Sequence, residues 1–390
     1  MMMWMSSAAG TLRQAHFLST GPKRILALDG GGIRGIISLA FVERLESLLA
    51  ARTGLPGFHL SQYFDLIGGT STGAIIAAGL ALGESAAHLI DMYLNLAHKG
   101  FRRNWSIGGT IAPKFDAETL RAVIHQQFGA ETLGSDNLQC GLGVVAKRID
   151  TGSVWLFHNH PRGPFFAPED ATLFTPNRDL LLANLLRAST AAPSYFAPEH
   201  IDVAPGVEGL FVDGGVSPHN NPALLLLMLA TMQGYGFRWP LGADQLMLLS
   251  LGTGSPRTRP VWGNFSSMPP LLLAVESLRS MMQDCNSLAQ TMLQWMSSSP
   301  AAWNIDSEIG DLRDDHLAPQ PLLHYLRYDV PLTEEWLRDT LRLNLSAGEL
   351  ELLKQFDRPD LASRFLDIGR RAAEVQLRAE HLPERFNLPL

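Results

Sequence analysis

The sequence predicts a three-layer α/β/α fold, in which helices cover both faces of a mainly parallel central sheet, with a mostly helical C-terminal region after it. Three observations support this prediction. Short apolar segments typical of buried strands alternate with longer segments of helical periodicity. Glycine-rich turns follow several of the apolar segments. After about residue 256, helical patterns predominate and strand signals become sparse.

The first half of the chain is expected to hold two strand–turn–helix units and a pair of joined strands. Residues 24–29 form a short apolar run, and apolar side chains at helical spacing follow over residues 33–50. The segment "YFDLIGGTSTG" predicts a second strand with a tight turn, before a helix over residues 72–82. The segments "GLGVVAKRID" and "VWLFHN" predict strands that meet around Thr151 and Gly152.

The second half continues the alternation and then changes character. The segments "GLFVDGG" and "QLMLLSLGTG" predict buried strands that end in glycine turns. Helices are predicted over residues 180–189, 220–232, 271–295 and 359–379. From this pattern we expect a flexible leader (residues 1–21), an α/β domain (residues 22–255) and a helical C-terminal region (residues 256–390).

Composition excludes several classes of protein. The 390 residues are 46% hydrophobic and 18% charged, which is typical of a globular chain with a substantial core. The formal net charge of −7, without a lysine or arginine run, predicts no nucleic-acid partner. The N-terminus lacks the pattern of a secretion signal, and the apolar runs fall well short of the ~18–20 residues that cross a bilayer. We therefore expect a cytoplasmic protein without a transmembrane segment.

The cysteines and histidines predict no metal site. Cys140 and Cys285 lie too far apart for a metal knuckle or a disulfide framework. His158 and His160 form an H-x-H pair without further nearby ligands, and such a pair is more often structural.

The loop "DGGGIRG" at residues 29–35 permits two functional interpretations, beside that of a glycine turn needed only for close packing. Gly30, Gly32 and Gly35 match the G-x-G-x-x-G fingerprint of dinucleotide-binding proteins. That fingerprint requires an acidic residue about 20 residues later, at the end of a second strand. Here the corresponding region continues the predicted helix, which disfavours a nucleotide. The other interpretation is that the uncovered N–H groups of consecutive glycines, before a helix N-terminus, stabilise the oxyanion of an acyl-transfer reaction.

Two further motifs favour the oxyanion. The segment "GTSTG" places Ser71 between Gly69 and Gly73 where a strand gives way to a helix, as in a nucleophile elbow. Bulky side chains at either glycine would clash in so sharp a turn. The segment "FVDGG" places Asp213 at the end of an apolar strand, where it is the candidate base for the serine hydroxyl.

Together the three motifs resemble the patatin-like phospholipase family. The matches are "DGGGIRG" at residues 29–35, "GTSTG" at 69–73 and "DGG" at 213–215, and "RASTAAPSYF" at 187–196 is also typical of this family. The resemblance runs from about Arg24 to Gly254, and the region after Pro256 is similar to bacterial members.

The resemblance implies a lipid acyl hydrolase that acts through a Ser71–Asp213 dyad and an acyl-enzyme, without a catalytic histidine, metal or cofactor. The implied oxyanion hole is the backbone of Gly30, Gly31 and Gly32, chiefly the last two. Arg34 is expected to brace this loop rather than meet a lipid phosphate. The supporting motif residues are Asp29, Gly35, Gly69, Gly73, Gly214 and Gly215. The implied partner is a phospholipid or another lipid ester, with contact to a membrane surface.

In the predicted fold we expect Ser71 and Asp213 at the C-terminal ends of neighbouring strands. A Ser–Asp–His triad of the α/β-hydrolase type, with His200, His219, His316 or His324 as the histidine, remains an alternative. So do a nucleotide-binding module and an inactive scaffold.

Overall fold

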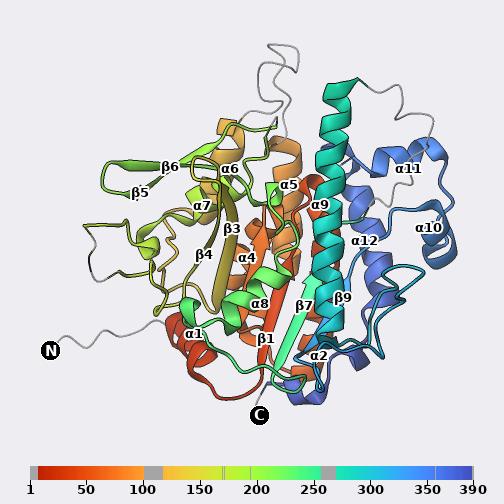
Figure 1. The fold of residues 1–390 in the computed structure, drawn as a ribbon, viewed down its shortest axis with the longest axis horizontal. Helices are drawn as coiled ribbons and strands as arrows, with labels where there is room; N and C mark the ends of the chain where they lie inside the picture. Colours follow the sequence, from red (N-terminus) through yellow and green to blue (C-terminus); the bar gives the residue numbers. More distant parts are fainter. Residues whose placement is uncertain are drawn as a thin grey trace.

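The computed structural model describes residues 8–100, 117–168, 170, 172–193, 195–255, 269–355 and 357–388. In these ranges a sheet of nine strands forms the centre of the molecule (Figure 1), in the order β5-β6-β3-β2-β1-β7-β9-β8, with β4 paired to β3. The strands are β1 (Lys23–Leu28), β2 (Leu66–Thr70), β3 (Gly141–Arg148), β4 (Ser153–His158), β5 (Glu199–Ala204), β6 (Val207–Asp213), β7 (Leu246–Leu251), β8 (Ser297–Ser298) and β9 (Leu323–Tyr328).

The centre of the sheet is parallel and one side is antiparallel. Strand β1 runs parallel to β2 and β7, β3 runs parallel to β2, and β9 runs parallel to β7 and β8. Strands β4 and β6 are antiparallel to β3, and β5 is antiparallel to β6. The predicted mainly parallel sheet is confirmed.

Helices cover both faces of the sheet. They are α1 (Ala8–Leu18), α2 (Gly35–Thr53), α3 (Leu60–Tyr63), α4 (Thr72–Ala81), α5 (Ala86–Gly100), α6 (Ala117–Phe128), α7 (Leu182–Ser189), α8 (Ala223–Thr231), α9 (Pro270–Trp295), α10 (Glu334–Leu341), α11 (Ala347–Leu353) and α12 (Ala362–Gln376). In the described ranges, every helix falls short, in length or in apolar character, of what crossing a bilayer requires.

Strand alternation divides the core into two layers. Leu26 and Leu28 of β1 belong to the core on the side of α2, α4, α5 and α12. Ile25 and Ala27 point the other way, into the core on the side of α8 and α9. Figure 1 shows α8 and α9 crossing in front of the sheet. The three-layer architecture is therefore as predicted.

The sequence analysis does not predict strand β9, which lies inside the sheet between β7 and β8. Its sequence, LHYLRY, places a histidine and an arginine in a six-residue run, which obscures the strand signal. Both His324 and Arg327 are buried, because the tertiary structure supplies partners for them. The C-terminal region is thus mostly helical but adds the two strands β8 and β9 to the sheet. Its predicted boundary at residue 256 lies outside the described residues.

The expected flexible leader also differs from the structure. Residues 8–18 form α1, and residues 1–7 lie outside the described ranges. His16 at the end of α1 is buried, and its ring nitrogens lie 2.8 Å from Asp65 Oδ1 and 2.9 Å from the Ser61 carbonyl. These buried contacts fix the helix to the domain.

Candidate active site

Ser71 occupies the sharp turn between β2 and α4. Its backbone has φ 55° and ψ −128°, a conformation that costs a non-glycine residue about 1–3 kcal/mol. The turn also brings backbones together, because a Cβ added at Gly69 would lie 2.2 Å from the Gly73 carbonyl and one at Gly73 would lie 2.3 Å from the Leu28 carbonyl. Only glycine fits at these two positions, as expected for a nucleophile elbow.

Asp213 reaches the same place from the opposite direction. It ends β6, pairs with Ala146 of β3, and β6 runs antiparallel to that strand. On the other side of β3, Thr70 of β2 pairs with Val145. The expectation that Ser71 and Asp213 end neighbouring strands is therefore wrong, since β3 lies between β2 and β6. The antiparallel direction of β6 nevertheless brings both residues to the same level of the sheet.

The two side chains are in direct contact. The Ser71 hydroxyl donates a hydrogen bond to Asp213 Oδ2 at 2.6 Å, and the Gly215 N–H donates one to Oδ1 at 2.7 Å. Both residues are buried. Burial raises the pKa of Asp213 to about 6, although the hydrogen bonds from Ser71 and Gly215 and the charge of Arg187 act in the opposite direction. The carboxylate is thus still mostly ionised at pH 7, and it accepts the hydrogen bond of the serine hydroxyl directly, with no side chain between them.

In the described part of the chain, no histidine ring forms a hydrogen bond with Ser71 or Asp213. His219 contributes its backbone, because its carbonyl accepts a hydrogen bond of 2.6 Å from the Thr70 hydroxyl. The ring of His200 pairs with Glu208 at the surface, and that of His324 lies 3.0 Å from the His381 carbonyl. The geometry favours a dyad over a triad.

The glycine loop lies against the serine. A Cβ added at Gly30 would come within 3.2 Å of the Ser71 Cβ. The Gly30 N–H is already committed to the Asn220 carbonyl at 3.0 Å. Among the described residues, by contrast, the N–H groups of Gly31 and Gly32 have no hydrogen-bond acceptor. These two donors, at the start of the turn that leads into α2, are available to an anion.

Three residues outside the predicted motifs hold this loop. The Asn220 amide and the Thr253 hydroxyl donate to the Gly30 carbonyl at 3.2 and 3.1 Å. The Tyr93 hydroxyl donates to the Gly32 carbonyl. Thr253 belongs to the glycine turn that ends the predicted strand "QLMLLSLGTG". The sequence signal for its role is that this turn follows a buried strand, as the glycine loop does.

Ser189 has a larger role than the helix cap that its place in the sequence suggests. Its hydroxyl accepts a hydrogen bond of 2.8 Å from the Ser71 N–H and donates one of 2.6 Å to the Val145 carbonyl of β3. It therefore links the elbow to the strand that separates Ser71 from Asp213. A Cβ added at Gly214 would lie 2.5 Å from the same Val145 carbonyl.

The remaining motif residues are buried around the loop. Asp29 forms an ion pair with Arg327, and burial raises its pKa to about 6 although the charge of Arg327 opposes this. Arg34 is buried, which lowers its pKa to about 10, and its Nη1 donates to the Lys354 carbonyl at 3.4 Å. A Cβ added at Gly35 would lie 2.4 Å from the Tyr93 hydroxyl. The contact of Arg34 supports a bracing role.

No cluster of three or more potential metal ligands occurs among the residues that the structure describes. His158 and His160 pack against the ring of Phe237, and burial lowers their pKa values to about 4 and about 3. Both are therefore neutral members of an aromatic cluster. Cys140 and Cys285 are free thiols.

Comparison with known proteins finds related sequences. The family model "Patatin-like phospholipase" matches residues 26–227. A "cGAMP-activated phospholipase" of Escherichia coli (strain TW11681) is 32% identical over 253 residues, which are 64% of this chain and 65% of that protein. A protein of the same name from Vibrio cholerae is 32% identical and covers 52% of this chain and 56% of its own. "Patatin group J-1" of Solanum tuberosum is 31% identical, covering 59% and 60%.

The chain thus spans less than two thirds of the length of these relatives. The family match, however, covers more than half of this chain and contains the glycine loop, the serine elbow and Asp213. This protein belongs to the patatin-like phospholipase family.

Proposed function

We propose that this protein is a lipid acyl hydrolase in which Ser71 is the nucleophile and Asp213 the base. The observation that carries the proposal is the 2.6 Å hydrogen bond from the Ser71 hydroxyl to the Asp213 carboxylate. The strained elbow presents the hydroxyl, and Gly30 of the glycine loop lies against Ser71. The N–H groups of the next two residues, Gly31 and Gly32, have no other partner among the described residues. These contacts support the assignment of a nucleophile, a base and oxyanion donors to one site.

The reaction proceeds through an acyl-enzyme. The Ser71 oxygen attacks the ester carbonyl while its proton passes to Asp213, and the carbonyl oxygen becomes an oxyanion bound by Gly31 and Gly32. Collapse of this intermediate releases the alcohol, which takes the proton back from Asp213. Water then attacks the acyl-enzyme and gives a proton to Asp213. The bond between the acyl carbon and the Ser71 oxygen breaks, Asp213 returns the proton to that oxygen, and a fatty acid leaves.

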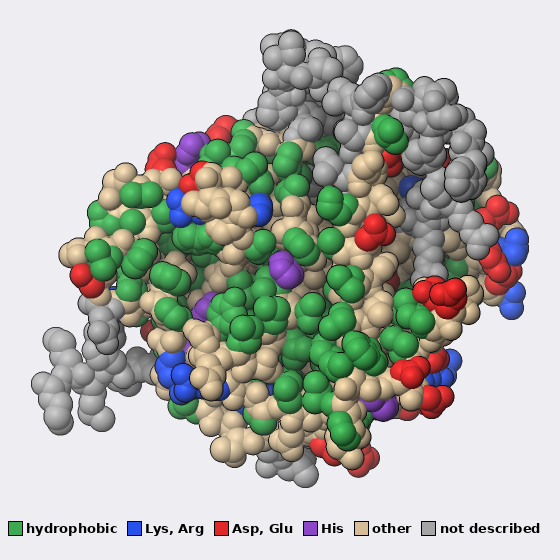
Figure 2. Space-filling view, viewed as in Figure 1, with side chains coloured by type: hydrophobic (Ala, Val, Ile, Leu, Met, Phe, Trp, Pro, Cys, Tyr) green, Lys and Arg blue, Asp and Glu red, His purple; other side chains and the backbone are tan. Residues whose placement is uncertain are grey.

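The proposed substrate class is a glycerophospholipid or a related lipid ester, and the support for it is the family and the names of the relatives. The enzyme would meet its substrate at a membrane surface. Exposed apolar side chains, including Met281 and Leu288 of α9, are available for such contact. Figure 2 shows hydrophobic side chains gathered over the face on which α8 and α9 lie.

Mass spectrometry of the products formed from mixed phospholipids, with the unmodified protein and with Ser71→Ala, tests this function. We expect free fatty acid and lysophospholipid from the unmodified protein alone. A Ser71→Ala variant that releases fatty acid at the same rate, after removal of contaminating lipases, would exclude the mechanism. Fluorescence titration with dinucleotides tests the alternative of a nucleotide-binding module. Tight binding of a dinucleotide would favour a nucleotide in the glycine loop.

A further inference from the structure

We propose that Arg327, on strand β9 of the C-terminal region, is a positioning residue that holds the oxyanion loop in place through Asp29. The inference rests on the proposed function, because it assigns the loop to the oxyanion. In the described ranges, the hydrogen bonds of the Arg327 guanidinium go to Asp29, Ser250 and Asp329, so Arg327 acts on the loop through these partners.

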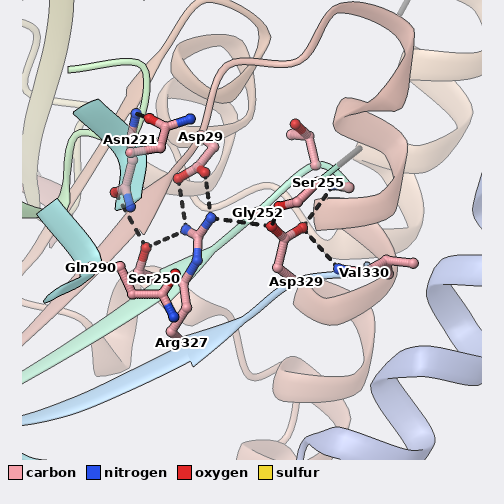
Figure 3. Close-up of polar contacts among 12 residues, drawn as sticks. Asp29, Asn221, Ser250, Gly252, Ser255, Gln290, Arg327, Asp329 and Val330 are labelled. Carbon is pink, nitrogen blue, oxygen red and sulfur yellow. Dashed lines mark hydrogen bonds and ion pairs between the residues drawn. The ribbon is translucent and has the colours of Figure 1, made fainter. Parts of the chain in front are cut away.

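The link between Arg327 and the loop begins at Asp29, the residue before Gly30. The Arg327 guanidinium donates from Nη1 to Asp29 Oδ1 at 2.9 Å and from Nη2 to Oδ2 at 2.7 Å. This is a two-bond, planar contact, which fixes the orientation of the carboxylate as well as its position. Figure 3 shows Arg327 pointing from β9 toward Asp29, with both bonds drawn. Both side chains are buried.

The same guanidinium joins the ends of three parallel strands. Nη1 also donates to the Ser250 hydroxyl of β7 at 2.7 Å, and Nη2 lies 3.4 Å from Asp329 Oδ2 just beyond β9 (Figure 3). Asp29 follows β1. Arg327 therefore ties the carboxyl ends of β1, β7 and β9 to one another, at the edge from which the glycine loop departs.

A second route leads from this cluster to the loop. Asp329 accepts hydrogen bonds from the N–H groups of Gly254 and Val330 at 2.7 and 2.8 Å. The residue before Gly254 is Thr253, whose hydroxyl donates to the Gly30 carbonyl. Gly30 is thus held by its covalent neighbour Asp29 and by the hydrogen bond from Thr253. Both contacts depend on the cluster around Arg327.

The expected consequence is a loss of turnover rather than of substrate binding. Oxyanion contacts form in the transition state, so a displaced loop lowers kcat while KM changes little. Arg327→Lys keeps the charge but cannot make the planar pair of bonds. We expect it to lower kcat about tenfold to a hundredfold, as for other residues that orient a catalytic group.

The matched control is Arg370, which also joins the C-terminal region to the N-terminal part of the sheet domain. It makes a two-bond ion pair with Glu43 of α2, at 2.7 and 2.8 Å, but at the surface and away from the glycine loop. Arg370→Lys should leave kcat and KM unchanged. The comparison shows whether the loss of any two-bond arginine ion pair lowers kcat, or only the loss of the pair between Arg327 and Asp29.

The experiment measures kcat and KM on a soluble p-nitrophenyl ester for the unmodified protein, Arg327→Lys, Arg370→Lys and the double variant Asp29→Asn/Arg327→Gln. Circular dichroism and thermal unfolding establish that each is folded. The double variant removes both buried charges together, so it is the substitute if Arg327→Lys does not fold. We expect its kcat to be reduced as well. A folded Arg327→Lys or double variant with kcat within twofold of the unmodified protein overturns the inference.

Hydrogen exchange of residues 29–35 supplies a readout that does not depend on activity. The N–H groups of Asp29 and Gly30 are bonded to the carbonyls of Leu251 and Asn220 at 3.0 Å each. Arg327→Lys should accelerate their exchange, and Arg370→Lys should not. If the unmodified protein hydrolyses no ester, the proposed function fails, while unchanged exchange in Arg327→Lys overturns only the positioning role.

Discussion

Replacing Gly31 by alanine tests whether the glycine loop serves the transition state. The φ angle of Gly31 is −171°, which any residue can adopt, so the obstacle is steric. Its new Cβ would lie 2.2, 2.4 and 2.7 Å from the Oγ1, Cβ and Cγ2 of Thr253. Because unstrained carbon atoms stay about 3.5–4.0 Å apart, the loop or Thr253 must move by roughly 1 Å.

A movement of this size displaces one oxyanion donor and loosens the Thr253 contact with the Gly30 carbonyl. Loss of one donor costs about 10²–10³ in kcat, or roughly 3–4 kcal/mol, and we expect Gly31→Ala to fall in this range with KM within about twofold. The assay is the rate of p-nitrophenyl ester hydrolysis as a function of substrate concentration. Gly348→Ala is the control, since nothing lies within 4 Å of that added Cβ in α11.

A second variant isolates the cause. Thr253→Gly removes all three clashing atoms, so Gly31→Ala/Thr253→Gly should be more active than the product of the two single effects predicts. If Gly31→Ala is folded and changes only KM, the loop binds substrate and does not stabilise an oxyanion, and the reasoning above is refuted.

Four further outcomes are expected. Asp213→Asn should abolish hydrolysis. Single alanine substitutions of the four candidate triad histidines should each leave most of the rate: His200, His219, His316 and His324. A folded histidine variant as inactive as Ser71→Ala would instead support the triad. The base must be ionised and burial raises the pKa of Asp213 to about 6, so kcat should fall as the pH drops through about 6, and a kcat unchanged down to pH 4.5 would contradict this. Ser189→Ala leaves the Ser71 N–H without its acceptor and should lower kcat about tenfold, as for other orienting contacts, with the soluble ester assay as the measure. Truncation near residue 256 removes β9 and exposes the edge of β7, so the product should be insoluble or inactive, and a soluble, fully active fragment would show the C-terminal region to be dispensable.

Much of the site could be predicted because its chemistry is local in sequence. The elbow needs glycines on either side of Ser71, and the loop needs consecutive glycines before a helix, so each motif is a short segment with a backbone reason for its residues. The strands that precede them are apolar because both faces of a parallel sheet are buried. These features are visible without any knowledge of distant contacts.

The contacts that organise the site join residues far apart in sequence, so they follow from the packing of the folded chain. Arg327 and Ser189 are far in sequence from the Asp29 and Ser71 that they contact. The sequence pattern of β9 does not show that Arg327 is buried. A buried arginine is stable only where a carboxylate pairs with it, and here that carboxylate comes from the residue after another strand. Likewise, β3 lies between the strands of Ser71 and Asp213 because of how all the strands of the sheet pair, and a single motif carries no information about that pairing. The amino-acid sequence thus indicates which groups are the candidates for the chemistry, and the packing of distant strands explains how those groups are held.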